Sequence, residues 1–266
     1  MNNERLMNDY VKDGFIGGIR VIPSEDAGYH RAELEKAEAE LGRLHYVQKI
    51  HTMLRFTYEL ATHPRLVNVV EAILGADILL YNTNYIIKEP NSPNFVSWHQ
   101  DLTYWGFDNE DLVSAWVAIT PATNESGCMQ MIAGSHKWGM RTHSLTDNDY
   151  NVLHLGQTIK DVKENSAAIC PLSPGEASLH HGWTIHSSEP NSSSDRRIGL
   201  NIQYVKPSMK QHAVKNDSAM LIRGEDHYGY FESDPQPPDK FPMDAKERMA
   251  ELTDRYEQIT NDESQR

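Results

Sequence analysis

Cysteine is scarce in this chain, and long apolar runs are missing. Its 266 residues include two cysteines, Cys128 and Cys170, with no CxxC pair. This spacing argues against a disulfide framework or a cysteine-based zinc site, so we expect two reduced and buried thiols. No apolar run approaches the roughly 18 to 20 residues that cross a bilayer. The first residues lack a basic stretch followed by an apolar one, so we expect a cytoplasmic protein that does not bind a membrane.

Positive charge is also in short supply. Lys and Arg number 25 against 38 Asp and Glu, which gives a net charge of −13. Nucleic acid is disfavoured as a partner because neutralising its phosphates requires clustered basic side chains. A local basic pocket remains compatible with this average, and we expect a small-molecule substrate. The sequence leaves the oligomeric state open.

Composition and length are those of a globular chain. Hydrophobic residues make up 39% and charged residues 24%, and a chain of this size can bury one sizeable core. We therefore predict a single domain over 1–266, with mainly helical residues at 1–76. Ser24 is predicted to cap a helix, and THPRLVNVVEAILG predicts another helix that ends at Gly75. Residues 206–266 are predicted to form a lid at 206–241, a helix in AKERMAELTDRYEQIT and an acidic tail.

From Asp77 onward the pattern changes to short runs in which apolar and polar residues alternate. Turn-forming Pro, Gly, Asn and Ser clusters separate these runs. The runs are ILLYNTNYIIK, NFVSWHQD, LVSAWVAIT, CMQMIAG, SAAIC, GEASLHH and RIGLNIQYV. Such a series predicts a mainly β fold with flanking helices and a jelly-roll, cupin-like core over 77–205. A polar stretch at about 139–165 is predicted to be an insertion over one end of the sheet.

The segment FVSWHQDLTYWG contains the first chemical signal. His99 and Asp101 are two residues apart on a predicted strand, and strand alternation would put both side chains on one face. One imidazole and one carboxylate can supply two of the three ligands of a facial triad for Fe(II). An isolated HxD pair also arises by chance as a surface hydrogen bond, so this pair needs a third ligand.

The segment PGEASLHHGWTIHSSEPNSSSDRRIGLNIQYV offers that ligand. His186 ends its first part, and Arg197 follows eleven positions later at the start of a β-patterned run. A hairpin of this length can bring both side chains to the same opening of a barrel. A cosubstrate that chelates iron through an α-keto acid keeps a distal carboxylate, which a guanidinium can hold with two hydrogen bonds.

The order of these motifs resembles a known family. HxD, then WVAITPATNESGCMQMIAGSHKWG, then GWTIHSSEPNSSSDRR resemble the phytanoyl-CoA dioxygenase (PhyH) family of Fe(II)/2-oxoglutarate-dependent oxygenases over residues 80–205. The resemblance implies a double-stranded β-helix core that uses Fe(II), 2-oxoglutarate and O₂. It implies that His99, Asp101 and His186 are the catalytic metal ligands, and that Arg197 binds the 2-oxoglutarate tail.

The resemblance also implies further residues around 2-oxoglutarate. Ser188 matches a residue that helps to hold the same carboxylate, and Trp116 matches a tryptophan that lines the cosubstrate pocket. Asn82 and Asn84 match positions where relatives carry amides near 2-oxoglutarate. We expect one of this pair to point inward, and we favour Asn84.

Neighbouring residues leave alternatives open. His180 or His181 could reach a metal near His186, although the spacing to the arginine favours His186. We expect one of these two histidines, together with Tyr104, to contact the substrate. Arg196 is the competitor of Arg197, and it would point to the opposite face of a regular strand.

The residues at the site predict a reaction class. Halogenating relatives replace the carboxylate at the position of Asp101 by a small residue, so its presence favours hydroxylation. We predict hydroxylation of an unactivated C–H of a small polar metabolite, with succinate and CO₂ as coproducts. A natural-product tailoring oxygenase, which hydroxylates, desaturates or cyclises, is the alternative within the family. Outside it, a Zn(II) hydrolase or a non-catalytic cupin-like binding protein are the alternatives, and the hydrolase leaves Arg197 without a role.

Overall fold

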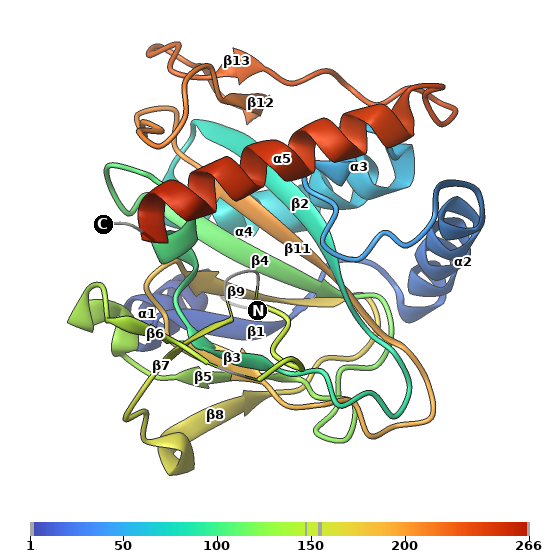
Figure 1. Cartoon of the computed structure of the whole chain (residues 1–266). Coiled ribbons are helices and arrows are strands. Elements are labelled where there is room, and N and C mark those ends of the chain that lie inside the picture. Colours follow the sequence, from blue (N-terminus) through green and yellow to red (C-terminus); the bar gives the residue numbers. More distant parts are fainter. Residues whose placement is uncertain (1–2, 147, 154–155, 265–266) are drawn as a thin grey trace.

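Two β-sheets face each other and form a jelly roll (Figure 1). The computed structural model describes residues 3–146, 148–153 and 156–264. A seven-stranded sheet has the order β1-β9-β4-β11-β2-β12-β13, a four-stranded sheet has the order β3-β10-β5-β8, and β6 pairs with β7. The strands are β1 (Phe15–Arg20), β2 (Ile78–Lys88), β3 (Val96–His99), β4 (Leu112–Ala118), β5 (Met129–Ile132), β6 (His143–Leu145), β7 (Gln157–Ile159), β8 (Ala167–Cys170), β9 (Glu176–His181), β10 (His186–Ser188), β11 (Arg197–Val205), β12 (Ser218–Arg223) and β13 (Glu232–Ser233). The predicted mainly β fold with a jelly-roll core is confirmed.

Strand β11 shows how the sequence places polar groups inside this fold. It runs antiparallel between β2 and β4, so its side chains alternate between the two faces of the large sheet. Ile198, Leu200 and Ile202 belong to the main hydrophobic core. Arg197 and Gln203, on the opposite face, line a cavity between the sheets. The apolar side chains of β11 therefore pack into the hydrophobic core, and the polar side chains on its other face point toward the cavity.

The helices agree in part with the sequence prediction. They are α1 (Asn3–Asp13), α2 (Ser24–Leu41), α3 (Arg55–Ala61), α4 (Pro64–Leu74) and α5 (Ala245–Ser264), with the short 3₁₀ helices η1 (Ile50–Thr52), η2 (Asp101–Tyr104), η3 (Ser135–Trp138) and η4 (Glu164–Ser166). Helix α4 ends before Gly75, whose φ of 94° suits glycine. The prediction that Ser24 caps a helix is wrong, because Pro23 occupies the N-cap position without a side-chain cap. The Ser24 hydroxyl instead donates to the Pro174 carbonyl at 3.1 Å.

Three strands of the large sheet come from segments that were not predicted to be β. Strand β1 lies within the N-terminal part that was expected to be helical, and β12 and β13 lie within the expected lid. The insertion at 139–165 contains the β6-β7 hairpin, while residues 147 and 154–155 of it, and 265–266 of the tail, lie outside the described residues. In Figure 1 helix α5 crosses in front of β2 and β11. Among the described residues, no helix combines the length and apolar character needed to span a bilayer.

Because several histidines are buried, we expect acid to lower the free energy of unfolding. Burial lowers the pKa of His30 to about 4 and that of His51 to about 3. The unfolded chain binds protons at these side chains below about pH 6.5, and the folded chain excludes them. Stability is therefore expected to fall by about 2 kcal/mol per histidine between pH 8 and pH 5. Denaturant unfolding at both pH values measures this drop.

A matched pair of variants tests the assignment. His30→Gln is expected to reduce the drop between pH 8 and pH 5 by about 2 kcal/mol. His227→Gln, at a histidine with 68% side-chain exposure, is expected to leave the drop unchanged. An equal drop in the wild type and in His30→Gln would contradict the prediction.

Candidate metal and cosubstrate site

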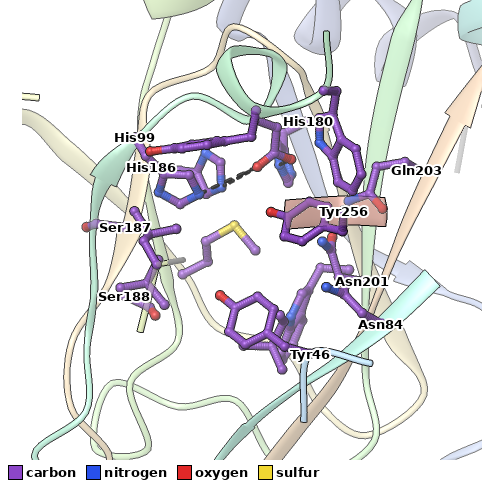
Figure 2. Close-up of a pocket in the computed structure, with 18 of the residues that line it drawn as sticks. Tyr46, Asn84, His99, His180, His186, Ser187, Ser188, Asn201, Gln203 and Tyr256 are labelled. Atoms are coloured by element: carbon purple, nitrogen blue, oxygen red, sulfur yellow. Dashed lines mark hydrogen bonds and ion pairs between the residues drawn. The ribbon is translucent and has the colours of Figure 1, made fainter. Parts of the chain in front are cut away.

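His99, Asp101 and His186 converge in the cavity, and Figure 2 shows the two histidines side by side. Their ligand atoms all lie within 4.8 Å of one another. The Nε2 atoms of His99 and His186 lie 3.5 and 3.6 Å from Oδ1 of Asp101. His99 ends β3 and pairs with His186 on β10. The prediction that Asp101 lies on the same strand as His99 is wrong, because Asp101 opens η2. The turn after β3 brings its carboxylate back toward the histidines.

Backbone carbonyls fix the ring orientation of both histidines. Nδ1 of His99 lies 2.8 Å from the Ser97 carbonyl, and Nδ1 of His186 lies 2.9 Å from the Thr184 carbonyl. A carbonyl only accepts, so each Nδ1 carries the hydrogen and each Nε2 presents its lone pair. Burial, followed by the neighbouring His99, holds the pKa of His186 well below its usual range. The neutral imidazole that a metal requires is therefore favoured.

The Asp101 carboxylate is held by two donors on its far oxygen. Oδ2 accepts from Ser114 Oγ at 2.5 Å and from His180 Nε2 at 3.1 Å, which leaves Oδ1 facing the two ligand histidines. Burial acts to raise the pKa of Asp101, but His186, His180 and His99 outweigh it and hold this pKa well below its usual range. The carboxylate is therefore ionised and oriented, as a metal ligand must be.

His180 and His181 lie on opposite faces of β9. His180 lines the cavity and contacts Asp101. His181 is not among the lining residues: its Nδ1 accepts from the Trp183 backbone N–H, and its ring lies against His136. The structure therefore places His180 behind a candidate ligand, where it supports the carboxylate.

Removing the Ser114 hydroxyl is expected to weaken metal binding. Supporting hydrogen bonds of this kind are typically worth about 10 to 100-fold in metal affinity, so Ser114→Ala is expected to raise the Fe(II) dissociation constant by that factor. Ser178→Ala is the matched control, because Ser178 is a buried serine whose hydroxyl has no partner among the described residues. Anaerobic competition with a chelator measures both variants. Equal affinities in the two would contradict the role of Ser114.

Arg197 supplies a buried positive charge in the same cavity. It is 3% exposed, its Nη2 donates to Ser188 Oγ at 3.3 Å, and its guanidinium lies 5.2 Å from the centre of the Trp116 ring. Burial lowers its pKa to about 10, so it remains charged at neutral pH. Within the described part of the chain, no acid lies within ion-pair distance of Arg197. Arg196, in contrast, points away and donates to Glu38 at 2.8 Å.

Asn82 and Asn84 both lie on the inner face of β2. Their partners across the strand are Gln203 and Asn201. A spacing of two residues puts both side chains on one face, but of the pair only Asn84 is among the described residues that line this cavity, as we favoured. Asn84 lines the cavity, and its Oδ1 has no partner among the described atoms. Asn82 is occupied, since its Nδ2 donates to Gln48 Oε1 at 2.8 Å and to Gln203 Oε1 at 3.1 Å.

The cavity encloses a free space of about 720 Å³, including its opening. Figure 2 shows Ser187 and Ser188 on one wall, with Asn84, Asn201 and Gln203 on the facing wall. Tyr104 lines the cavity, and its contact with a substrate stays a prediction. Further lining residues were not predicted from the sequence: Tyr46, Ser187, Asn201, Gln203 and Tyr256. The alternation of β11 from Arg197 could have identified Asn201 and Gln203, but no local pattern marks Tyr46 or Tyr256.

A jelly roll with a His-Asp-His cluster between its sheets is the arrangement of a non-haem oxygenase. Residues 27–199 match the sequence model of the phytanoyl-CoA dioxygenase (PhyH) family. The chain belongs to this family.

Individual relatives agree with the family. The chain is 30% identical over 155 residues to the 1-deoxypentalenic acid 11-beta-hydroxylase of Streptomyces arenae, a match that covers 55% of this chain and 54% of that protein. It is 26% identical over 213 residues to human peroxisomal phytanoyl-CoA dioxygenase, which covers 78% and 61%. The chain thus spans between half and two thirds of these curated relatives. The solved non-heme monooxygenase ThoJ is similar with a TM-score of 0.85 and 28% identity, over 98% of this chain and 99% of that one.

Proposed function

We propose that this protein is an Fe(II)/2-oxoglutarate-dependent dioxygenase that hydroxylates an unactivated C–H of a small polar metabolite and releases succinate and CO₂. The observation that carries the proposal is the convergence of His99, Asp101 and His186 within 4.8 Å. Bound iron would supply the oxygen chemistry. These residues would hold it from one side, so that its remaining positions face the cavity.

The other charged group in the cavity fits 2-oxoglutarate. An unpaired buried guanidinium is costly unless an anion meets it, and Arg197 has no acidic partner among the described residues. The distal carboxylate of 2-oxoglutarate would provide that anion, with Ser188 as a further donor and Trp116 beneath the guanidinium. A Zn(II) hydrolase would leave Arg197 unused. It would also have no carboxylate free to act as general base, because Asp101 is the only acid among the described residues that line the cavity.

The cavity wall formed by Asn84, Asn201 and Gln203 (Figure 2) carries no charged side chain. This supports a small polar substrate. Gln203 lines the cavity; its Oε1 accepts from Asn82 Nδ2, and its Nε2 has no partner among the described atoms. Asn201 and Tyr256 line the same space. Neutral donors and acceptors favour a substrate with carbonyl, hydroxyl or amide groups over a phosphate or a nucleotide thioester, which requires cations.

A natural-product intermediate is the second candidate substrate. It is favoured by the similarity to the 1-deoxypentalenic acid 11-beta-hydroxylase, whose name describes oxidation of such a compound. The proposed cofactors are the same for both classes of substrate.

A substrate screen tests the proposal. The protein is loaded with Fe(II) under argon, mixed with 2-oxoglutarate and a panel of polar metabolites and natural-product precursors, and exposed to O₂. Succinate formation that rises with one compound, together with a product heavier by one oxygen, is expected. Hydrolysis of a panel member by the Zn(II)-loaded protein, with no 2-oxoglutarate binding to the Fe(II) protein, would overturn it.

A further inference from the structure

Lys88 is a buried cation beside Arg197 that the proposed mechanism does not use. It ends β2 and pairs with Arg197 across the sheet. Lys88 is 1% exposed, and no acid among the described residues lies within ion-pair distance of it. Its ammonium contacts the residues that follow His186: Nζ lies 3.0 Å from the Ser188 carbonyl and 2.7 Å from Ser188 Oγ, and it also contacts the Glu189 carbonyl.

The contacts of Lys88 fix the hydrogen-bonding role of the Ser188 hydroxyl. Three acceptors surround Nζ of Lys88. Only the ammonium form carries the three N–H donors that satisfy all of them, so these contacts favour that form against the effect of burial. Ser188 Oγ accepts from Lys88 and also from Arg197 at 3.3 Å, so both of its lone pairs are occupied. Its own O–H can then only donate. No described residue accepts that hydrogen, and Ser188 lines the cavity.

We propose that Lys88 is a positioning residue for the cosubstrate: it locks the Ser188 hydroxyl so that its O–H donates to the distal carboxylate held by Arg197. The inference rests on the proposed function. Lys88 does not touch the cosubstrate, since its three hydrogens are already used. It acts through Ser188 and adds a second positive charge where a carboxylate would bind.

The electrostatics of Lys88 agree with a site built for an anion. Burial lowers its pKa to about 6, and the charge of Arg197 acts in the same direction, while the exposed Glu189 and buried Cys128 oppose the shift. Two buried cations side by side are unfavourable without a counter-ion. A carboxylate bound at this end of the cavity would favour the ammonium form, because opposite charge stabilises the charged state.

A comparison of two ligands tests the proposal with an internal control. 2-Oxoglutarate and 2-oxopentanoate share the iron-chelating keto acid, and the second carries a methyl group where the first has its distal carboxylate. Affinities are measured anaerobically on the Fe(II)-loaded protein from the visible charge-transfer band. Lys88→Met is expected to weaken 2-oxoglutarate about tenfold or more, the effect of one charge-assisted hydrogen bond, and to leave 2-oxopentanoate within about twofold.

Ser188→Ala and the double variant test the route of the effect. Because Lys88 acts through Ser188, the double variant is expected to bind 2-oxoglutarate no more weakly than the worse single variant. Equal loss of both ligands in Lys88→Met, no loss of either, or additive losses in the double variant would overturn the proposal. If Lys88→Met does not fold, Lys88→Gln takes its place: selective loss of 2-oxoglutarate relative to 2-oxopentanoate supports the proposal, and unchanged discrimination overturns it. A wild-type protein that binds neither ligand would instead refute the proposed function.

Discussion

Replacement of Asp101 by alanine is expected to lower the rate of succinate formation by far more than 100-fold. Loss of a hydrogen bond that only supports a metal ligand typically costs about 10 to 100-fold, and loss of the ligand itself costs more. Asp101 is the only acid that lines the cavity among the described residues, and its Oδ1 lies 3.5 and 3.6 Å from the two candidate imidazole ligands. Without it, two neutral imidazoles remain, with no anionic ligand to hold the cation. Succinate is measured by mass spectrometry, and metal content is measured in parallel.

The matched control for this substitution is Asp239→Ala. The Asp239 side chain is 92% exposed and lies 3.1 Å from Arg55 at the surface. We expect this variant to retain wild-type turnover and metal content, since exposed ion pairs contribute little. If Asp101→Ala formed succinate at a rate similar to that of Asp239→Ala, the assignment of the metal ligands would be wrong.

Arg197→Met is expected to weaken 2-oxoglutarate binding by about 100-fold. Two charge-assisted hydrogen bonds to a carboxylate, formed in a buried site, are worth about 3 kcal/mol or more, and 1.4 kcal/mol corresponds to a factor of ten. Methionine keeps much of the length and apolar contact of the side chain against Trp116. The measurement is an anaerobic titration of the Fe(II)-loaded protein with 2-oxoglutarate.

Arg196→Met provides the comparison from the neighbouring position. Its guanidinium lies on the other face of the sheet and donates to Glu38 and Glu89, so its loss is expected to affect stability and not the cosubstrate. A dissociation constant for 2-oxoglutarate within about twofold of wild type is expected for this variant. If Arg196→Met weakened 2-oxoglutarate as much as Arg197→Met did, the cosubstrate would not be bound where we place it.

Spacing along the chain predicted the parts of the site that belong to short motifs. His99 and Asp101 are close in sequence, and His186 and Arg197 are eleven positions apart, so spacing indicated both pairs. The predicted hairpin between His186 and Arg197 is wrong, because β10 lies in the four-stranded sheet and β11 in the seven-stranded sheet, and the loop between them crosses from one sheet to the other. Strand alternation does not explain why His99 and Asp101 converge, because Asp101 starts η2 instead of continuing the strand. Where the chain turns after β3 depends on tertiary packing, which strand alternation does not describe.

Contacts between distant strands could not be predicted in this way. Ser114 lies opposite His180 where β4 pairs with β9, and both side chains reach Asp101 on η2. Lys88 lies opposite Arg197 where β2 pairs with β11, and it reaches Ser188 on β10 of the facing sheet. Both contacts require the sheet order and register, and a serine or lysine in a strand has no distinctive spacing of its own. Tyr256 reaches the cavity from α5, which depends on where the C-terminal helix packs.

The same limitation explains the fold elements that the sequence did not predict. Strand β1 is the short run FIGGIR, whose two glycines weaken any strand pattern, and it is stabilised by pairing with β9. Strand β12 follows a stretch rich in turn-forming residues and is completed by pairing with β2. Long segments with a strong period, such as β2 and α4, were predicted because their local pattern and their tertiary role agree.

The most direct test of the metal centre is a crystal structure of the protein grown anaerobically with Fe(II). We predict one ion bound by Nε2 of His99, Oδ1 of Asp101 and Nε2 of His186 at about 2.0 to 2.2 Å, by analogy with other divalent-metal sites. Its remaining positions would open toward Arg197. An ion bound elsewhere, or one that any of these three side chains fails to ligate, would contradict the account.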